Sequence, residues 1–196
     1  VMIDRRRFVC GMAVAMVAGC APADRRARIG FLRFQSGDGA RQNRRLDAFR
    51  QGMRALGYEE GRNYAVEVAS GGGDPVALAA AARGLAASNV DVIVTGSLRG
   101  AGAARDATTK IPVVVVAGDL EAAGFVDHEL RPRQNVTGLT FLTGELTAKR
   151  VEKLRDVKPG LKSVALVVGI RNAVSTIVQG HVEAAGRMLG VRVHPF

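Results

Sequence analysis

Two polar segments follow apolar runs in the middle of this sequence, and they are its best candidates for chemistry. Gly96-Ser97 stands between the run Val90–Thr95 and a helical pattern, so its N–H groups and hydroxyl could hold an anion such as a carboxylate. Asp119 follows the run Pro112–Ala117 and could accept a hydrogen bond from a ligand amine. Each also has a purely structural interpretation, Ser97 as a helix cap and Asp119 as a turn or cap residue. The two segments predict a binding site for a small solute.

Residue sets that perform covalent chemistry are sparse. His128, His181 and His194 lie far apart in the sequence and lack the cysteine or acidic pattern typical of a metal site. No Gly-x-Ser-x-Gly elbow surrounds a serine. The glycine spacing that starts at Gly96 does not match a dinucleotide loop, and there is no Gly-Lys-Ser/Thr phosphate loop. We therefore expect a binding protein rather than an enzyme, with no catalytic residues, no metal and no cofactor.

Alternating strand and helix patterns must position these loops. Strands are expected at Arg28–Phe34, Asn63–Val68, Val90–Thr95, Pro112–Ala117, Val136–Phe141, Ser163–Val168 and from Val191, and helices at Gln42–Leu56, Asp74–Ala87, Arg99–Thr109, Ala122–Glu129 (short), Glu145–Val157 and Val174–Leu189. This alternation is typical of an α/β protein with a doubly wound parallel sheet. Ligands bind such sheets beyond the carboxyl ends of the strands, where the loops Gln35–Ala40, Gly96–Gly100 and Gly118–Ala122 stand.

The pattern restarts after its fifth strand, which predicts two lobes. Residues 29–141 hold enough strands for a first α/β lobe, whereas residues 142–196 hold one strand, two helices and the start of another strand. The second set has too few elements to bury its apolar faces. We expect either a truncated chain, which we favour, or docking of these elements onto the first sheet.

The first twenty residues are typical of an export signal. Three arginines, Arg5 to Arg7, precede an apolar run that is too short to cross a bilayer. Val17-Ala18-Gly19-Cys20 resembles a bacterial lipobox, which implies a signal peptide at 1–19, lipid on Cys20 and a tether at 20–28. A twin-arginine route and a general secretory route both stay open. The location expected is the periplasm or cell surface, with a lipid anchor in the membrane.

Composition narrows the possible partners. The net charge is +10, but aromatic residues make up only 5% of the chain and the arginines are scattered. No zinc spacing or base-reading basic helix accompanies the charge, so we expect no nucleic-acid partner. A solvated basic surface, near anionic lipid, is the simpler explanation.

Several separated motifs resemble those of bacterial ABC-transporter substrate-binding proteins. They are Leu56-Gly57-Tyr58-Glu59-Glu60-Gly61-Arg62-Asn63, Val90–Val94, Ile111–Val114, Asn135-Val136-Thr137-Gly138-Leu139-Thr140, Glu145–Arg150 and Pro159–Leu166. The resemblance covers roughly residues 28–172. It implies a periplasmic-binding-protein-like fold of type I, with a ligand cleft between two lobes.

The resemblance also implies a function and a set of site residues. It implies capture of a small solute, in some relatives an aromatic amino acid, and its delivery to a membrane permease. The family's ligand loops correspond to Gly96, Ser97 and Asp119, and Asn172 stands near the position of the family's aromatic-Asn-Pro segment. This sequence departs from the family pattern at Asp119-Leu120, where the family has Asp-Pro. An exported sensor domain without transport, or a non-functional truncated fragment, are the alternatives.

Overall fold

The computed structural model describes residues 26–35, 40–141, 143–168 and 173–196. In chain order its elements are β1 (Ala27–Arg33), α2 (Ala40–Ala55), β2 (Tyr64–Ser70), α3 (Pro75–Ala87), β3 (Val92–Thr95), α4 (Leu98–Ala107), β4 (Val113–Ala117), β5 (Val136–Thr140), α5 (Thr143–Val157), β6 (Ser163–Leu166), α6 (Ala173–Leu189) and β7 (Arg192–Pro195).

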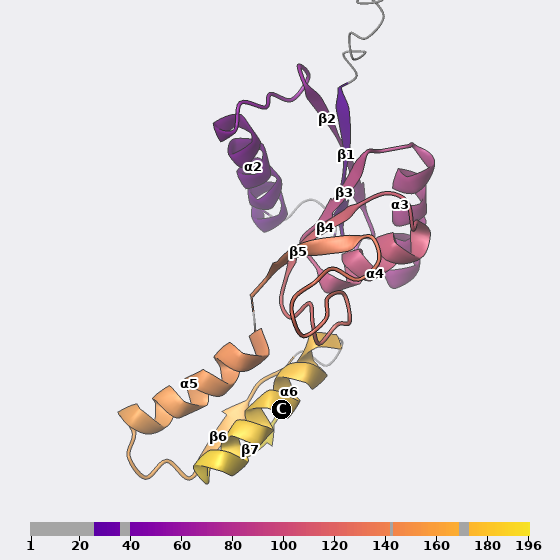
Figure 1. Ribbon diagram of the computed structural model, residues 1–196. Helices are drawn as coiled ribbons and strands as arrows, with labels where there is room; N and C mark the ends of the chain where they lie inside the picture. The colour runs from indigo at the N-terminus through magenta and orange to yellow at the C-terminus, as the bar shows by residue number, and fades with distance from the viewer. Residues whose placement is uncertain (1–25, 36–39, 142, 169–172) are drawn as a thin grey trace, which may run out of the picture.

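The first five strands form one parallel sheet in the order β2-β1-β3-β4-β5. The helices between them cover both faces, with α2 on one side and α3 and α4 on the other (Figure 1). The predicted doubly wound α/β fold is therefore confirmed. In this order β1 and β3 are neighbours, and Leu32 pairs with Thr95, so the loops that follow these two strands leave the sheet side by side.

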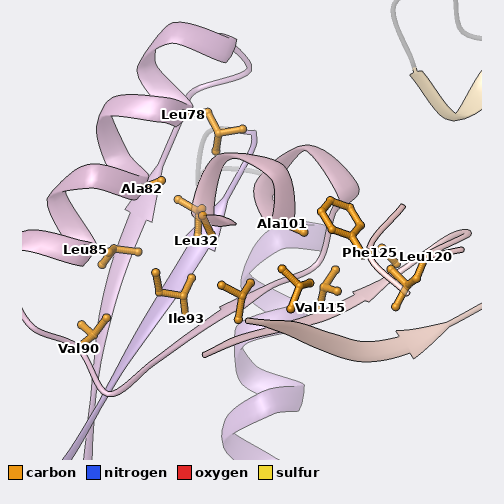
Figure 2. Packing of buried hydrophobic residues seen from close by; sticks show 14 of the residues in the cluster. Leu32, Leu78, Ala82, Leu85, Val90, Ile93, Ala101, Val115, Leu120 and Phe125 are labelled. Atoms are coloured by element: carbon orange, nitrogen blue, oxygen red, sulfur yellow. The ribbon is translucent and has the colours of Figure 1, made fainter. Parts of the chain in front are cut away.

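The main core lies between the sheet and helices α3 and α4 (Figure 2). Alternate residues of β4 face this core, so Val113 and Val115 are fully buried while Val116 is exposed on the other face. Leu78 and Leu85 of α3 pack against the same layer. Helix α3 begins as expected, with Pro75 in its first turn and the Asp74 carboxylate accepting a hydrogen bond from the N–H of Ala77 at 2.8 Å.

Helix α2 packs on the opposite face through a few apolar side chains. Leu46 is buried, and the ring of Phe49 lies 5.8 Å from the ring of Phe31 and 6.5 Å from that of Tyr64. Gly57 ends this helical segment with a positive φ of 83°, as expected for a glycine that follows a helix. The arginine-rich amino-terminal half of α2 is thereby held close to the ends of β1 and β3.

The last two strands form a second sheet of their own. Strands β6 and β7 pair in parallel, and α5 and α6 pack beside them. Their small core consists of Val151, Val182 and Val191, with partly buried side chains around it. In the described residues these strands do not join the first sheet, and this second α/β unit is incomplete.

One predicted element is wrong. The expected short helix over Ala122–Glu129 is replaced by turns and by an isolated bridge between Val126 and Pro132. The Asp127 carboxylate accepts hydrogen bonds from the N–H groups of Glu129 and Arg131, both at 2.9 Å. Such bonds compete with helical ones, because they satisfy the same backbone donors in a turn.

Candidate functional site

A pocket of about 320 Å³ lies where β1 and β3 end and α2 approaches the sheet. Its lining consists of Phe31, Leu32, Arg33, Phe34, Gln35, Arg45, Gly96 and Ser97. Three parts of the chain contribute to it, namely the end of β1, Arg45 of the helix α2 that follows, and the loop between β3 and α4. The structure thus brings Gly96 and Ser97 into one pocket with the end of β1.

Ser97 is the N-cap of helix α4. Its backbone is extended, and its Oγ accepts a hydrogen bond from the N–H of Gly100 at 3.0 Å. This bond satisfies one of the N–H groups that the start of a helix leaves without an intrahelical partner. The hydroxyl proton stays available for donation. Ser97 can therefore cap α4 and also present a donor, together with the positive end of the helix, to an anion in the pocket.

Gly96 lies directly against the guanidinium group of Arg45. The Nη1 atom of Arg45 donates a long hydrogen bond of 3.5 Å to the carbonyl oxygen of Gly96. A Cβ atom on Gly96 would stand 3.3 Å from that same nitrogen, closer than most side-chain contacts allow. The missing side chain therefore lets a charged group of α2 reach the loop that precedes α4.

Two further guanidinium groups add positive charge here. Arg33 ends β1, and its Nε atom is buried with no hydrogen-bond partner among the described residues. Arg99 in the first turn of α4 lies over the ring of Phe34, 4.9 Å from the ring centre. An unpaired buried donor costs free energy, and a ligand with an acceptor group can recover it. The geometry therefore suits a negatively charged ligand.

Asp119 lies beyond the end of β4 and is not part of the pocket lining. Its side chain is buried, with 7% of the residue exposed, and its Oδ1 accepts a hydrogen bond from the N–H of Ala122 at 3.0 Å. Thr140 of β5 holds the same loop, since its Oγ1 donates to the carbonyl oxygen of Gly118 at 2.7 Å. In this structure Asp119 shapes a turn next to the site.

Two predicted site residues, Asn172 and Cys20, lie outside the described residues. Within the part of the chain that the structure describes, no group of histidine, cysteine, aspartate and glutamate side chains is placed to hold a metal ion. No helix in those ranges combines the length and apolar character needed to cross a membrane.

Sequence reasoning missed the two arginines in the pocket lining. Arg33 is the last residue of β1 and directly follows the apolar run Ile29–Leu32, and a charge at that place is a usable signal. Arg45 precedes the inward-facing Leu46 on α2, but nothing local in the sequence indicates which strand end it reaches. Of the loop Gln35–Ala40, Gln35 lines the pocket, whereas residues 36–39 lie outside the described ranges.

Comparison with known proteins gives one family. The family model described as "ABC transporter substrate binding protein" matches residues 28–195. No curated protein matches.

Solved structures share the fold over most of this chain. A conserved domain protein from Vibrio cholerae O1 biovar El Tor is 26% identical, with a TM-score of 0.74 over 88% of this chain and 57% of that one. An ABC domain from Streptococcus pneumoniae, solved in complex with L-Trp, is 22% identical with a TM-score of 0.72 over 88% and 57%.

A third structure is a solute binding protein of an ABC transporter from Rhodopseudomonas palustris BisB5, in complex with 3,4-dihydroxybenzoic acid. It is 19% identical, with a TM-score of 0.65 over 88% of this chain and 47% of that one. This chain therefore spans 57% of the length of the first two structures and 47% of the third.

Proposed function

The chain belongs to the ABC transporter substrate-binding protein family, and on that premise we propose that it captures a small solute and presents it to a membrane permease. The observation that carries this proposal is the pocket at the ends of β1 and β3. Its position agrees with the rule that doubly wound sheets bind ligands beyond the carboxyl ends of their strands. Its size lies within the range typical of small-molecule sites.

We assign direct ligand contacts to Gly96 and Ser97. Ser97 offers a hydroxyl donor and the positive end of α4, and Gly96 leaves room for Arg45. Asp119 acts as a positioning residue, because its Oδ1 already accepts a hydrogen bond from the N–H of Ala122. Asn172 stays a prediction for the second unit. Two relatives were solved with ligands that contain a carboxyl group, L-Trp and 3,4-dihydroxybenzoic acid, which supports an acidic group at this pocket.

Export and anchoring complete the proposal. Cys20 carries lipid after removal of residues 1–19, and the chain then works at the outer side of a membrane beside its permease. The two lobes close around the solute, and the permease would recognise this closed form. In this scheme residues 142–196 belong to the second lobe, and the chain performs no covalent chemistry.

Binding can be tested with Ser97 variants of the full chain. A panel of small carboxylic acids and amino acids is titrated by ligand-observed NMR, and the best binder is carried forward. Ser97→Ala should weaken its binding about fivefold or more, since one hydrogen bond and a helix cap are lost. Ser97→Thr keeps a hydroxyl and should bind as the wild type does. If no member of the panel binds, or if both variants bind equally well, the proposed site is wrong.

Anchoring can be tested by metabolic labelling with a radioactive fatty acid in a bacterial host. The wild-type chain and a Cys10→Ser control should both incorporate label and sediment with membranes. Cys20→Ser should lose the label. Label on Cys20→Ser, or an unlabelled wild-type chain in the cytosol, contradicts the lipid-anchored location.

A further inference from the structure

We propose that this pocket selects a small organic acid that carries no ammonium group, in preference to an α-amino acid. This inference names the ligand class of the proposed site and therefore rests on the proposed function. It comes from the distribution of charge around the pocket, from the position of Asp119 outside the pocket lining, and from the apolar side chains next to the arginines.

Positive charge converges on the pocket from two elements. Arg33 comes from the end of β1 and the exposed Arg45 from α2, and both line the cavity. The Nε of Arg33 is buried without a partner among the described residues. Within the same ranges, the side chain of Arg45 donates to one carbonyl oxygen, that of Gly96, at the long distance of 3.5 Å. Guanidinium groups with unused donors bind carboxylates strongly, because the bonds are charge-assisted and can be bidentate.

No negative charge balances these arginines in the described lining of the pocket. Asp119, which follows β4, stands outside this lining; it is buried, and its Oδ1 accepts a hydrogen bond from the N–H of Ala122. An ammonium group that enters the pocket would lose water and meet two like charges without an acceptor carboxylate. The charge distribution therefore favours a ligand with an acidic group alone.

The remaining lining is apolar. Phe31, Leu32 and Phe34 contribute to the cavity, and the guanidinium of Arg99 covers the ring of Phe34 at 4.9 Å. A hydrophobic body can therefore lie against this side while its carboxylate faces Arg33 and Arg45. A volume of about 320 Å³ is enough for an acid with one aromatic ring, a fused pair of rings or a short branched chain.

The test compares ligands that differ only in the ammonium group. The full chain, kept soluble in mild detergent, is titrated with 3-phenylpropionate against L-phenylalanine and with indole-3-propionate against L-tryptophan. The dissociation constant of each acid should be lower than that of its amino acid by about tenfold or more, which is the effect of roughly 1.4 kcal/mol. This comparison uses the wild-type chain alone and does not depend on any variant folding correctly.

Arginine variants then test which side chains produce the preference for acids over amino acids. Arg33→Gln and Arg45→Gln should each weaken binding of the acid about tenfold. Each should also reduce the ratio between the dissociation constants of the amino acid and of the acid. Arg54→Gln changes an exposed arginine at the end of the same helix α2 and serves as the matched control, with no expected change. Circular dichroism of every variant confirms that the helices are retained.

The outcomes separate this inference from the function on which it rests. Equal or tighter binding of the amino acids contradicts the ligand class but leaves a solute-binding function in place. Binding of neither acids nor amino acids contradicts both. Unchanged selectivity in folded Arg33→Gln and Arg45→Gln contradicts the assignment of these two arginines.

Discussion

Three residues of the segment 135–140 contact backbone atoms of β4 or of the segments just before and after it. The side-chain nitrogen of Asn135 donates to the carbonyl oxygens of Thr108 and Ile111 at 2.8 and 2.7 Å. The hydroxyl of Thr140 donates to the carbonyl of Gly118 at 2.7 Å. Gly138 lies so close to β4 that a Cβ atom would overlap the carbonyl oxygen of Val115. These contacts give the motif Asn135–Thr140 a structural role at the edge of the first sheet.

Replacing Gly138 with alanine should strongly destabilise the first sheet. The added methyl group cannot coexist with the Val115 carbonyl, so β5 must move away from β4 and lose its pairing. We expect a loss of about 2 kcal/mol or more in the free energy of unfolding, measured by urea denaturation and circular dichroism.

Gly52→Ala is the matched control for this change. Gly52 lies inside α2, and a Cβ atom there would meet nothing within 4 Å. Alanine favours a helix interior over glycine, so this variant should gain about 0.5–1 kcal/mol. A Gly138→Ala variant as stable as the wild type would show that β5 does not approach β4 in the way described.

An exposed ion pair on α5 gives a pH-dependent prediction. The ammonium of Lys153 donates to Asp156 at 2.8 Å, and this hydrogen bond holds the pKa of the Asp156 carboxyl below its ordinary value. Because the folded pKa is lowered, the pair stabilises the fold above the ordinary aspartate pKa and ceases to do so as pH falls through the folded pKa. Lys153→Gln should raise the pKa of Asp156 in a carboxyl NMR titration, and Lys158→Gln should leave it unchanged.

At the scale of elements, helix α2 is held on the first sheet by few apolar side chains. Leu46 is its buried apolar anchor, and Phe49 adds ring contacts with Phe31 and Tyr64. A half-exposed ion pair between Arg50 and Glu60, 2.6 Å long, links the helix to the turn before β2. The hydrogen bond to Glu60 raises the pKa of Arg50 above its usual value. Surface pairs of this kind contribute little, so the apolar anchors decide whether α2 stays docked.

Leu46→Ala should therefore loosen α2 and destabilise the chain by about 2 kcal/mol. Leu56→Ala removes the same group at a position that is 75% exposed, and should change stability by less than about 0.5 kcal/mol. Urea denaturation of both variants checks the difference. Equal effects would mean that Leu46 does not anchor the helix.

Most elements of the fold could be predicted from apolar patterns, whereas only part of the candidate site could: Gly96 and Ser97 line the pocket as expected, but its two arginines were missed. The run Pro112–Ala117 predicted β4 to within one residue of Val113–Ala117, because a buried central strand is apolar throughout. The helix predicted over residues 122–129 is absent, because the Asp127 carboxylate accepts hydrogen bonds from backbone N–H groups that a helix would need. Arg45 was missed because the tertiary packing of α2, rather than its local sequence, carries that side chain to the end of β3.

On the scale of the whole molecule, the chain has two hydrophobic clusters of unequal size. The large one joins the first sheet with α3 and α4, and it includes the fully buried Ile93. The small one has three buried valines between α5, α6 and the β6–β7 sheet. Several large apolar side chains around the small cluster stay exposed, among them Leu154, Val157 and Met188. The second unit therefore buries much less apolar surface than the first.

Amide hydrogen exchange should reveal this inequality. The amides of β6 should exchange at least about 100-fold faster than those of β3, because both β6 and β7 are edge strands over a small core. Exchange followed by NMR or mass spectrometry measures the ratio. Equal protection in β3 and β6 would show that the two units unfold as one.

With the proposed ligand, the position of Arg45 would link solute binding to the docking of α2 on the sheet. A carboxylate that bridges Arg45 of α2 and Arg33 of β1 ties the helix to the sheet, so occupancy of the pocket opposes undocking of α2. By thermodynamic linkage, residues that never touch the ligand then share control of its affinity. Substitutions at Phe49, whose ring helps to hold α2 on the sheet, would therefore change the affinity for the solute without touching it.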